Sequence, residues 1–92
     1  MIAKRVVVRG RVQGVGFRFS VVDVAQEHGL VGWVRNRFDG AVEAWLQGDA
    51  SGVERVADWC RRGPSSAQVT DAEVVDAPVD SSLRDFTQRP TR

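Results

Sequence analysis

The stretch "GRVQGVGFRFS", residues 10–20, joins two segments of different hydrophobic periodicity. Up to this point, "KRVVVRGRV" alternates valines with arginines, which predicts a strand with one buried face. From Phe17 onward, Val21 and Ala25 follow at helical spacing, and Gly29 is well placed to end a helix. The stretch is therefore predicted to connect the first strand to the first helix.

The next segment has the pattern of a hairpin followed by a helix. "GWVRNRFDGAVEAWLQG", residues 32–48, holds two alternating runs on either side of an Asp-Gly dipeptide, which is typical of hairpin turns. Ser51 and Glu54 have the S-x-x-E spacing of a capping box, and apolar residues then recur at helical spacing up to a Gly-Pro pair. We expect two strands and a second helix here.

The remainder of the chain predicts one clear strand and one weak one. "AQVTDAEVVDA", residues 67–77, is rich in β-formers and alternates in polarity. "RDFTQR", residues 84–89, is a weaker candidate for a short fifth strand, because Pro90 would end any ladder. We expect residues 90–92 to fray.

The order β-α-β-β-α-β predicts an α+β fold, the ferredoxin-like split βαβ sandwich, in which two helices cover one face of an antiparallel sheet. A chain of 92 residues has room for one core, so residues 1–92 are expected to form a single domain. This architecture hosts many unrelated activities, so function has to be argued from the site.

Composition excludes several classes of function. Thirteen basic and twelve acidic residues leave a net charge of +1, which does not favour nucleic acid or an anionic membrane as a partner. We see no signal peptide and no membrane span, so we expect a cytoplasmic protein. Cys60 is the only cysteine and His28 the only histidine, so neither a disulfide nor a Cys/His zinc site is expected.

The connection itself has the features of a phosphate site. Glycines at positions 14 and 16 let successive N–H groups turn toward one point, and the helix that follows adds its free N–H groups and dipole. Arg18 contributes a planar, permanently charged fork that matches phosphate. The alternative is a glycine-rich connection beside an ordinary surface arginine.

Three better-known motifs do not fit this connection. A dinucleotide fingerprint would need a third glycine where Phe19 stands, and no Walker Gly-Lys-Ser/Thr sequence follows. "GVGFRF" has the composition of an RNA-recognition motif, but that motif lies on the third strand of its fold and here the string follows the first.

The motifs "GRVQGVGFR" and "GLVGWVRNRFDGAVE", with "GPSSAQV" further on, together resemble the acylphosphatase family over nearly the whole chain. The resemblance implies hydrolysis of the carboxyl-phosphate bond of small acyl phosphates, without metal or cofactor. It also implies that Arg18 and Asn36 are catalytic. The family's phosphate-binding loop matches Gln13, Gly14, Val15, Gly16, Phe17 and Arg18.

These implied roles are chemically consistent. Arg18 and the loop N–H groups would stabilise charge on the transferring phosphoryl group, and the Asn36 amide would orient the attacking water. An amide is a poor general base, so the substrate phosphate is expected to accept the proton. The chain departs from the family pattern at its end, where the apolar residue expected two positions after Phe86 is the polar Gln88.

Two other functions remain as alternatives. A non-catalytic module on the same fold would bind phosphate without turnover. An RNA-binding domain is disfavoured by the near-neutral charge and by the position of the aromatic string. The expected partner is a small acyl phosphate, and the expected state is a monomer.

Overall fold

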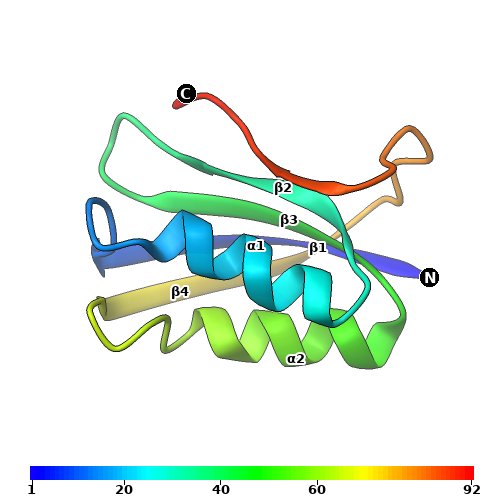
Figure 1. Ribbon diagram of the computed structural model, residues 1–92, viewed down its shortest axis with the longest axis horizontal. Coiled ribbons are helices and arrows are strands. Elements are labelled where there is room, and N and C mark those ends of the chain that lie inside the picture. Colours follow the sequence, from blue (N-terminus) through cyan, green and yellow to red (C-terminus); the bar gives the residue numbers. More distant parts are fainter.

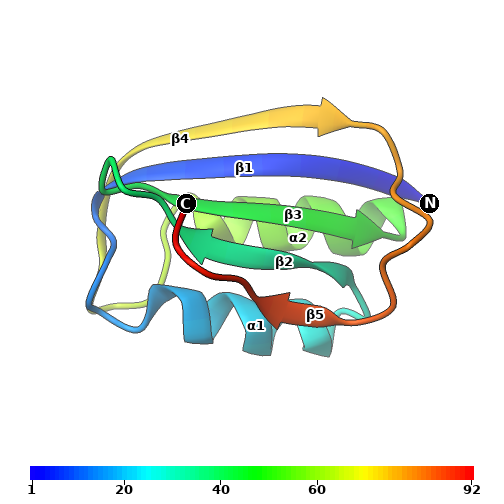
Figure 2. The same ribbon diagram turned by 90° about the horizontal axis from the view of Figure 1, so that it is seen from above.

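The computed structural model describes all 92 residues and forms one five-stranded sheet of order β4-β1-β3-β2-β5. Both helices lie on the same face of this sheet (Figures 1 and 2). The elements are β1 (Ile2–Arg11), α1 (Phe17–Glu27), β2 (Val31–Asn36), β3 (Val42–Gly48), α2 (Ala50–Cys60), β4 (Gln68–Ala77) and β5 (Phe86–Gln88). The predicted ferredoxin-like order of strands and helices is confirmed.

The core lies between the helices and the sheet. Valines from β1 and β2 meet the apolar stripes of both helices there, and burial of each such side chain stabilises the fold by roughly 1.5–3 kcal/mol. The buried helical residues are Phe17, Val21 and Ala25 in α1 and Gly52, Val53, Val56, Ala57 and Cys60 in α2. The helical faces expected from sequence spacing are therefore the faces that pack.

The predicted capping box of α2 is wrong. The helix begins at Ala50 with Asp49 as its N-cap residue, and no side chain makes a capping hydrogen bond. Asp49 has extended backbone angles (φ −60°, ψ 141°), so the chain turns helical before it reaches Ser51. Ser51 therefore lies inside the first turn, where its hydroxyl cannot cap the free N–H groups.

The weakly predicted fifth strand forms, and its pairing makes the sheet mixed. β5 pairs with β2 in parallel, whereas the other strand pairs are antiparallel, so the sheet is mixed rather than antiparallel as predicted. The chain leaves β4 at one edge and crosses to the other edge, so it enters β5 in the same direction as β2 (Figure 2). The Gln47 side chain holds this crossing through two hydrogen bonds of 2.9 Å with the backbone of Asp80.

The C-terminal tail continues along β2. The backbone N–H of Arg89 donates to the carbonyl of Val34 at 2.9 Å, and the N–H of Arg92 donates to the carbonyl of Asn36 at 3.1 Å. The carbonyl of Arg92 in turn accepts from the N–H of Phe38 at 3.2 Å. Residues 90–92 were expected to fray, but these backbone hydrogen bonds hold the tail beside the end of β2.

The helix-free face of the sheet carries a buried carboxylate held by two arginines, which we call the Glu43 cluster (Arg5, Arg35 and Glu43). The two Glu43 oxygens accept from Arg5 at 2.6 Å and from Arg35 at 2.8 Å. Burial acts to raise the pKa of Glu43, but hydrogen bonds from Arg5 and Arg35 outweigh it and hold that pKa below its ordinary value. Arg35 also lies over the ring of Trp33, 4.5 Å from its centre.

Candidate active site

The connection between β1 and α1 adopts the conformation that its glycines allow. Gly14 (φ 73°) and Gly16 (φ 80°) are both left-handed, a region that costs other residues roughly 1–2 kcal/mol. Gly16 is the N-cap residue of α1, and the first helical N–H to find a partner is that of Ser20, which donates to the Gly16 carbonyl. The N–H groups before it form a free donor cluster at the helix start.

Two tethers hold this loop in place. The Gln13 amide donates to the carbonyls of Arg37 and Ala41, at 2.8 and 2.9 Å, and so ties the loop to the β2–β3 hairpin. Ser66 donates to the carbonyl of Val15 at 2.7 Å, which ties the loop to the segment before β4. The side chains of Gln13 and Ser66 thus fix the position of the loop relative to the hairpin.

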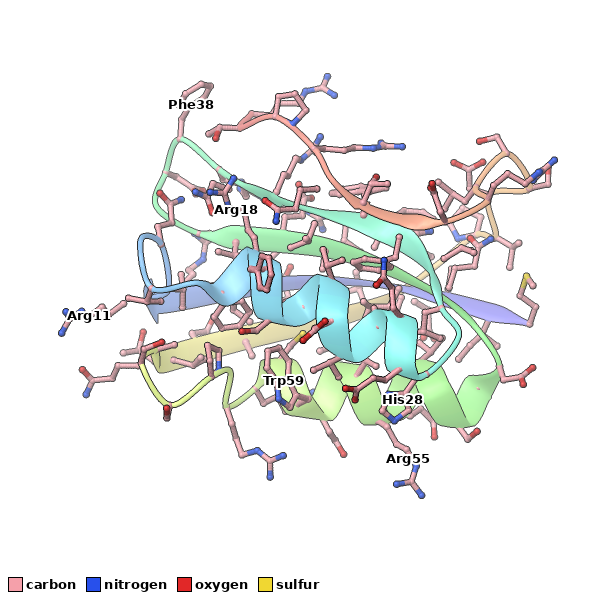
Figure 3. The ribbon with its side chains drawn as sticks, in the orientation of Figure 1. Arg11, Arg18, His28, Phe38, Arg55 and Trp59 are labelled. Carbon is pink, nitrogen blue, oxygen red and sulfur yellow. The ribbon has the colours of Figure 1, made fainter.

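One pocket of about 160 Å³ opens where the loop, α1 and the ends of β2 and β5 meet. Figure 3 shows Arg18 reaching from the first turn of α1 toward the ends of these strands, while Arg11 points away from the molecule. The residues on the wall are Val12, Gly14, Gly16, Phe17, Arg18, Phe19, Asn36 and Gln88. Of the predicted loop residues, Gln13 and Val15 are not on this wall.

Arg18 and Asn36 come together in this pocket although β1, which leads into the Arg18 loop, is not a neighbour of β2, which ends at Asn36. β3 lies between β1 and β2 in the sheet, so the two motifs do not meet by strand pairing. They meet because α1 crosses the sheet and brings its N-terminus over the end of β2. The direction in which α1 crosses the sheet therefore brings Arg18 to the same pocket as Asn36.

Both polar side chains lack protein partners. Arg18 is half-buried and makes no ion pair with a carboxylate, unlike Arg9 and Arg37, which both pair with Asp39 in the hairpin. The side-chain oxygen of Asn36 is buried and has no hydrogen-bond partner, a state that costs roughly 1–3 kcal/mol. The pocket wall therefore carries a cation without an anionic partner and an amide whose oxygen has no protein donor.

The carboxylate nearest to Asn36 in the sequence, Asp39, already has partners within the hairpin and from β1. Asp39 accepts from the backbone N–H of Ala41 at 3.0 Å. This hydrogen bond, a second one from Arg9 and the nearby charge of Arg37 hold the pKa of Asp39 below its ordinary value. Cys60 is the last residue of α2 and faces the core, where burial raises the pKa of its thiol to about 12. Neither group is suited to act as a base or a nucleophile in the pocket.

Three residues of the wall were not assigned to the site from the sequence: the buried Val12, and Phe19 and Gln88. The polarity of Gln88 was noticed as a departure from the family pattern, but its place in the pocket depends on β5 pairing beside β2. Phe19 had no signal beyond its position after Arg18. Both side chains are exposed.

No group of three or more His, Cys, Asp or Glu side chains is arranged to hold a metal ion. Neither helix combines the length and the apolar character needed to cross a membrane.

Solved structures define the class of the fold. The chain superimposes on the crystal structure of an acylphosphatase from Bacillus subtilis with a TM-score of 0.91 and 35% identity, over 97% of this chain and 99% of that one. An acylphosphatase structure from Coxiella burnetii gives a TM-score of 0.90 at 35% identity, over 96% and 92% of the two chains. The fold is the α+β ferredoxin-like fold of these enzymes.

Sequence comparisons define the family. The acylphosphatase family model matches residues 4–88. An acylphosphatase of Rhizorhabdus wittichii is 49% identical over 90 residues, which cover 98% of this chain and 90% of the relative. One of Acidiphilium cryptum is 56% identical over 71 residues, 77% of this chain and 78% of the relative. The chain belongs to the acylphosphatase family, and with it to the hydrolases.

Proposed function

We propose that this protein hydrolyses the carboxyl-phosphate bond of small acyl phosphates, with Arg18 and Asn36 as catalytic residues. Water attacks phosphorus, the bond from phosphorus to the carboxyl oxygen breaks, and a carboxylate and inorganic phosphate leave. The observation that carries the proposal is that a free guanidinium and a buried, unpartnered amide oxygen share one small pocket beside a left-handed glycine loop.

Arg18 and the loop are assigned to the phosphoryl group. Phosphoryl transfer spreads charge over three equatorial oxygens, so fixed donors aimed at those oxygens lower the barrier. The N–H groups after Gly14 and Gly16 and the start of α1 supply such donors, and Arg18 adds two more in a fork. Because Arg18 has no carboxylate partner, no ion pair has to break when the substrate binds.

Asn36 is assigned to the attacking water. Its unpartnered oxygen can accept a hydrogen bond from water, which leaves a lone pair of the water free to attack phosphorus. An amide does not remove the proton, so the proton passes to a phosphoryl oxygen of the substrate. The leaving group is a stable carboxylate, so no protein acid is needed to protonate it.

The test measures phosphate release from benzoyl phosphate in EDTA by the wild type, Arg18→Ala, Asn36→Ala and the matched control Arg11→Ala. Loss of one such donor typically lowers kcat about 100- to 1000-fold, and we expect that loss in the first two variants only. Arg18→Lys should recover part of the activity, because it keeps the charge but not the fork. Circular dichroism checks that each variant is folded.

Three outcomes separate the alternatives. Folded wild type that binds phosphate without turnover would replace the proposal by the phosphate-binding module. Turnover that survives in Arg18→Ala or Asn36→Ala would remove that residue from the mechanism. Turnover that disappears in EDTA and returns with a divalent metal would overturn the metal-free mechanism. The cytoplasmic location and the monomeric state stay predictions.

A further inference from the structure

Phe19 and Gln88 are the exposed residues of the pocket wall that the proposed mechanism does not use. The loop and Arg18 are assigned to phosphate, and Asn36 is assigned to water. Phe19 lies in the first turn of α1 and is 70% exposed, and Gln88 ends β5 and is also exposed. An exposed aromatic and an exposed amide on the wall of one small pocket form its rim, which we call the acyl rim (Phe19 and Gln88).

The register of β5 aims Gln88 at the pocket. Side chains two residues apart on a strand share a face, so Gln88 points to the same side as Phe86. Phe86 is 3% exposed and belongs to the core under the helices. Gln88 pairs with Val34, so it stands on the helix side of the sheet, one strand away from Asn36. Its side chain makes no hydrogen bond with the protein, which leaves the whole amide available to a ligand.

Phe19 is the one exposed aromatic residue on the pocket wall. The three tryptophans, Phe17 and Phe86 are buried or half-buried, whereas Phe19 and Phe38 are exposed. Phe38 lies in the hairpin turn and is not on the pocket wall, while Phe19 is. A ligand that covered a ring at the mouth of the pocket would remove apolar surface from water, which favours binding.

We propose that the acyl rim binds the acyl group of the substrate, with Gln88 selecting acyl groups that carry a hydrogen-bonding group beside the carbonyl and Phe19 favouring rings. This inference rests on the proposed function. When the loop holds the phosphoryl group in the inner part of the pocket, the acyl group of the same substrate lies between Phe19 and Gln88 at the mouth. Selectivity is modest, because both residues remain open to solvent on one side.

Acetyl and carbamoyl phosphate form a matched pair of probes for Gln88. They differ only in a methyl against an amino group beside the carbonyl, and the amino group can donate to the Gln88 side-chain oxygen. Gln88→Met keeps the length of the side chain but removes its hydrogen-bonding atoms. The ratio of kcat/KM for carbamoyl to that for acetyl phosphate should fall about 2- to 10-fold in Gln88→Met, the effect of one hydrogen bond.

Benzoyl and acetyl phosphate test Phe19 in parallel. The ratio of kcat/KM for benzoyl to that for acetyl phosphate should fall about 2- to 10-fold in Phe19→Ala, since the ring contact is lost. Controls are Thr87→Ala, a neighbour on the opposite face of β5, and Phe38→Ala, an exposed phenylalanine off the pocket wall. Both controls should keep both ratios.

Inhibition by inorganic phosphate separates the acyl rim from the phosphate cradle. Its inhibition constant should not change in Gln88→Met or Phe19→Ala, because the rim does not contact phosphate. An unchanged ratio in a folded variant overturns the assignment of that residue, and an inhibition constant that rises in step with KM shows that it acts through the cradle instead. A wild type that hydrolyses none of the three substrates would overturn the proposed function itself.

Discussion

The Glu43 cluster and the pocket lie on opposite faces of the same sheet, and they treat their polar groups in opposite ways. Each oxygen of Glu43 has an arginine partner within 2.8 Å, and the carboxylate is buried. In the pocket, Arg18 has no carboxylate and the Asn36 oxygen has no donor. Groups that serve stability are satisfied within the fold, whereas groups left unsatisfied at a cost are those that a ligand can satisfy.

The largest expected effect comes from Asn36→Leu, which removes the unpartnered amide. Activity on benzoyl phosphate should fall at least about 100-fold, because the attacking water loses its acceptor. The free energy of unfolding should rise by about 1 kcal/mol, since a buried oxygen without a partner is replaced by apolar atoms. Enzyme assays and urea denaturation measure the two changes. A large loss of stability would contradict the comparison, because it would make Asn36 a structural residue.

The second largest effect is expected for Glu43→Gln, which removes the negative charge from the Glu43 cluster. The free energy of unfolding should fall by about 2–3 kcal/mol, because Arg5 and Arg35 keep their charge and lose their anion. Activity per folded molecule should be retained, since the cluster lies on the face opposite the pocket. Urea denaturation and phosphate release check this pair of results. A stable but inactive variant would show that the two faces are coupled.

Low pH should destabilise the protein through the same Glu43 cluster. The pKa of Glu43 is held below its ordinary value of 4.5, so its stabilisation is fully present above that pH and is lost as pH falls through the folded-state pKa. From about pH 5 downward, the urea midpoint of the wild type should therefore drop more than that of Glu43→Gln. Parallel curves for the two proteins would remove Glu43 from the acid response.

The smallest expected effect is at Ser51, remote from both regions. Because Ser51 lies within α2 and does not cap it, Ser51→Ala should change the free energy of unfolding by less than about 0.5 kcal/mol. A true capping serine would cost about 1 kcal/mol on the same change. Thermal denaturation distinguishes these values, and the larger one would restore the capping box.

Much of the fold could be predicted because it follows from local spacing. The stripe from Phe17 to Ala25 indicates the buried face of a helix, and the alternation around the hairpin turn indicates two strands, although both faces of β3 are mostly buried. The capping box at α2 was predicted wrongly for a local reason as well. Ser51 and Glu54 have the spacing of a capping box, but the helix already begins at Ala50. Spacing identifies a helix more reliably than it identifies its first residue.

The site could be predicted only in part. The glycine loop and Arg18 are contiguous in sequence, and a left-handed turn before a helix makes a donor cluster wherever it occurs. Gln13 belongs to the same stretch, yet its amide ties the loop to the hairpin and does not reach the pocket wall. Its partners are carbonyls 24 and 28 residues away, which no local pattern specifies.

The sequence by itself determined the order of the elements and the family, because side-chain periodicity and backbone freedom are local properties and the motifs are contiguous. Only the tertiary structure decided that β5 pairs in parallel with β2, that the tail is held beside Asn36, and that Gln88 and Phe19 line the same pocket. A strand of three residues has too little pattern of its own to specify a partner. Its place depends on the path of the chain across the sheet and on the burial of Phe86, and both exist only once the rest of the molecule has folded.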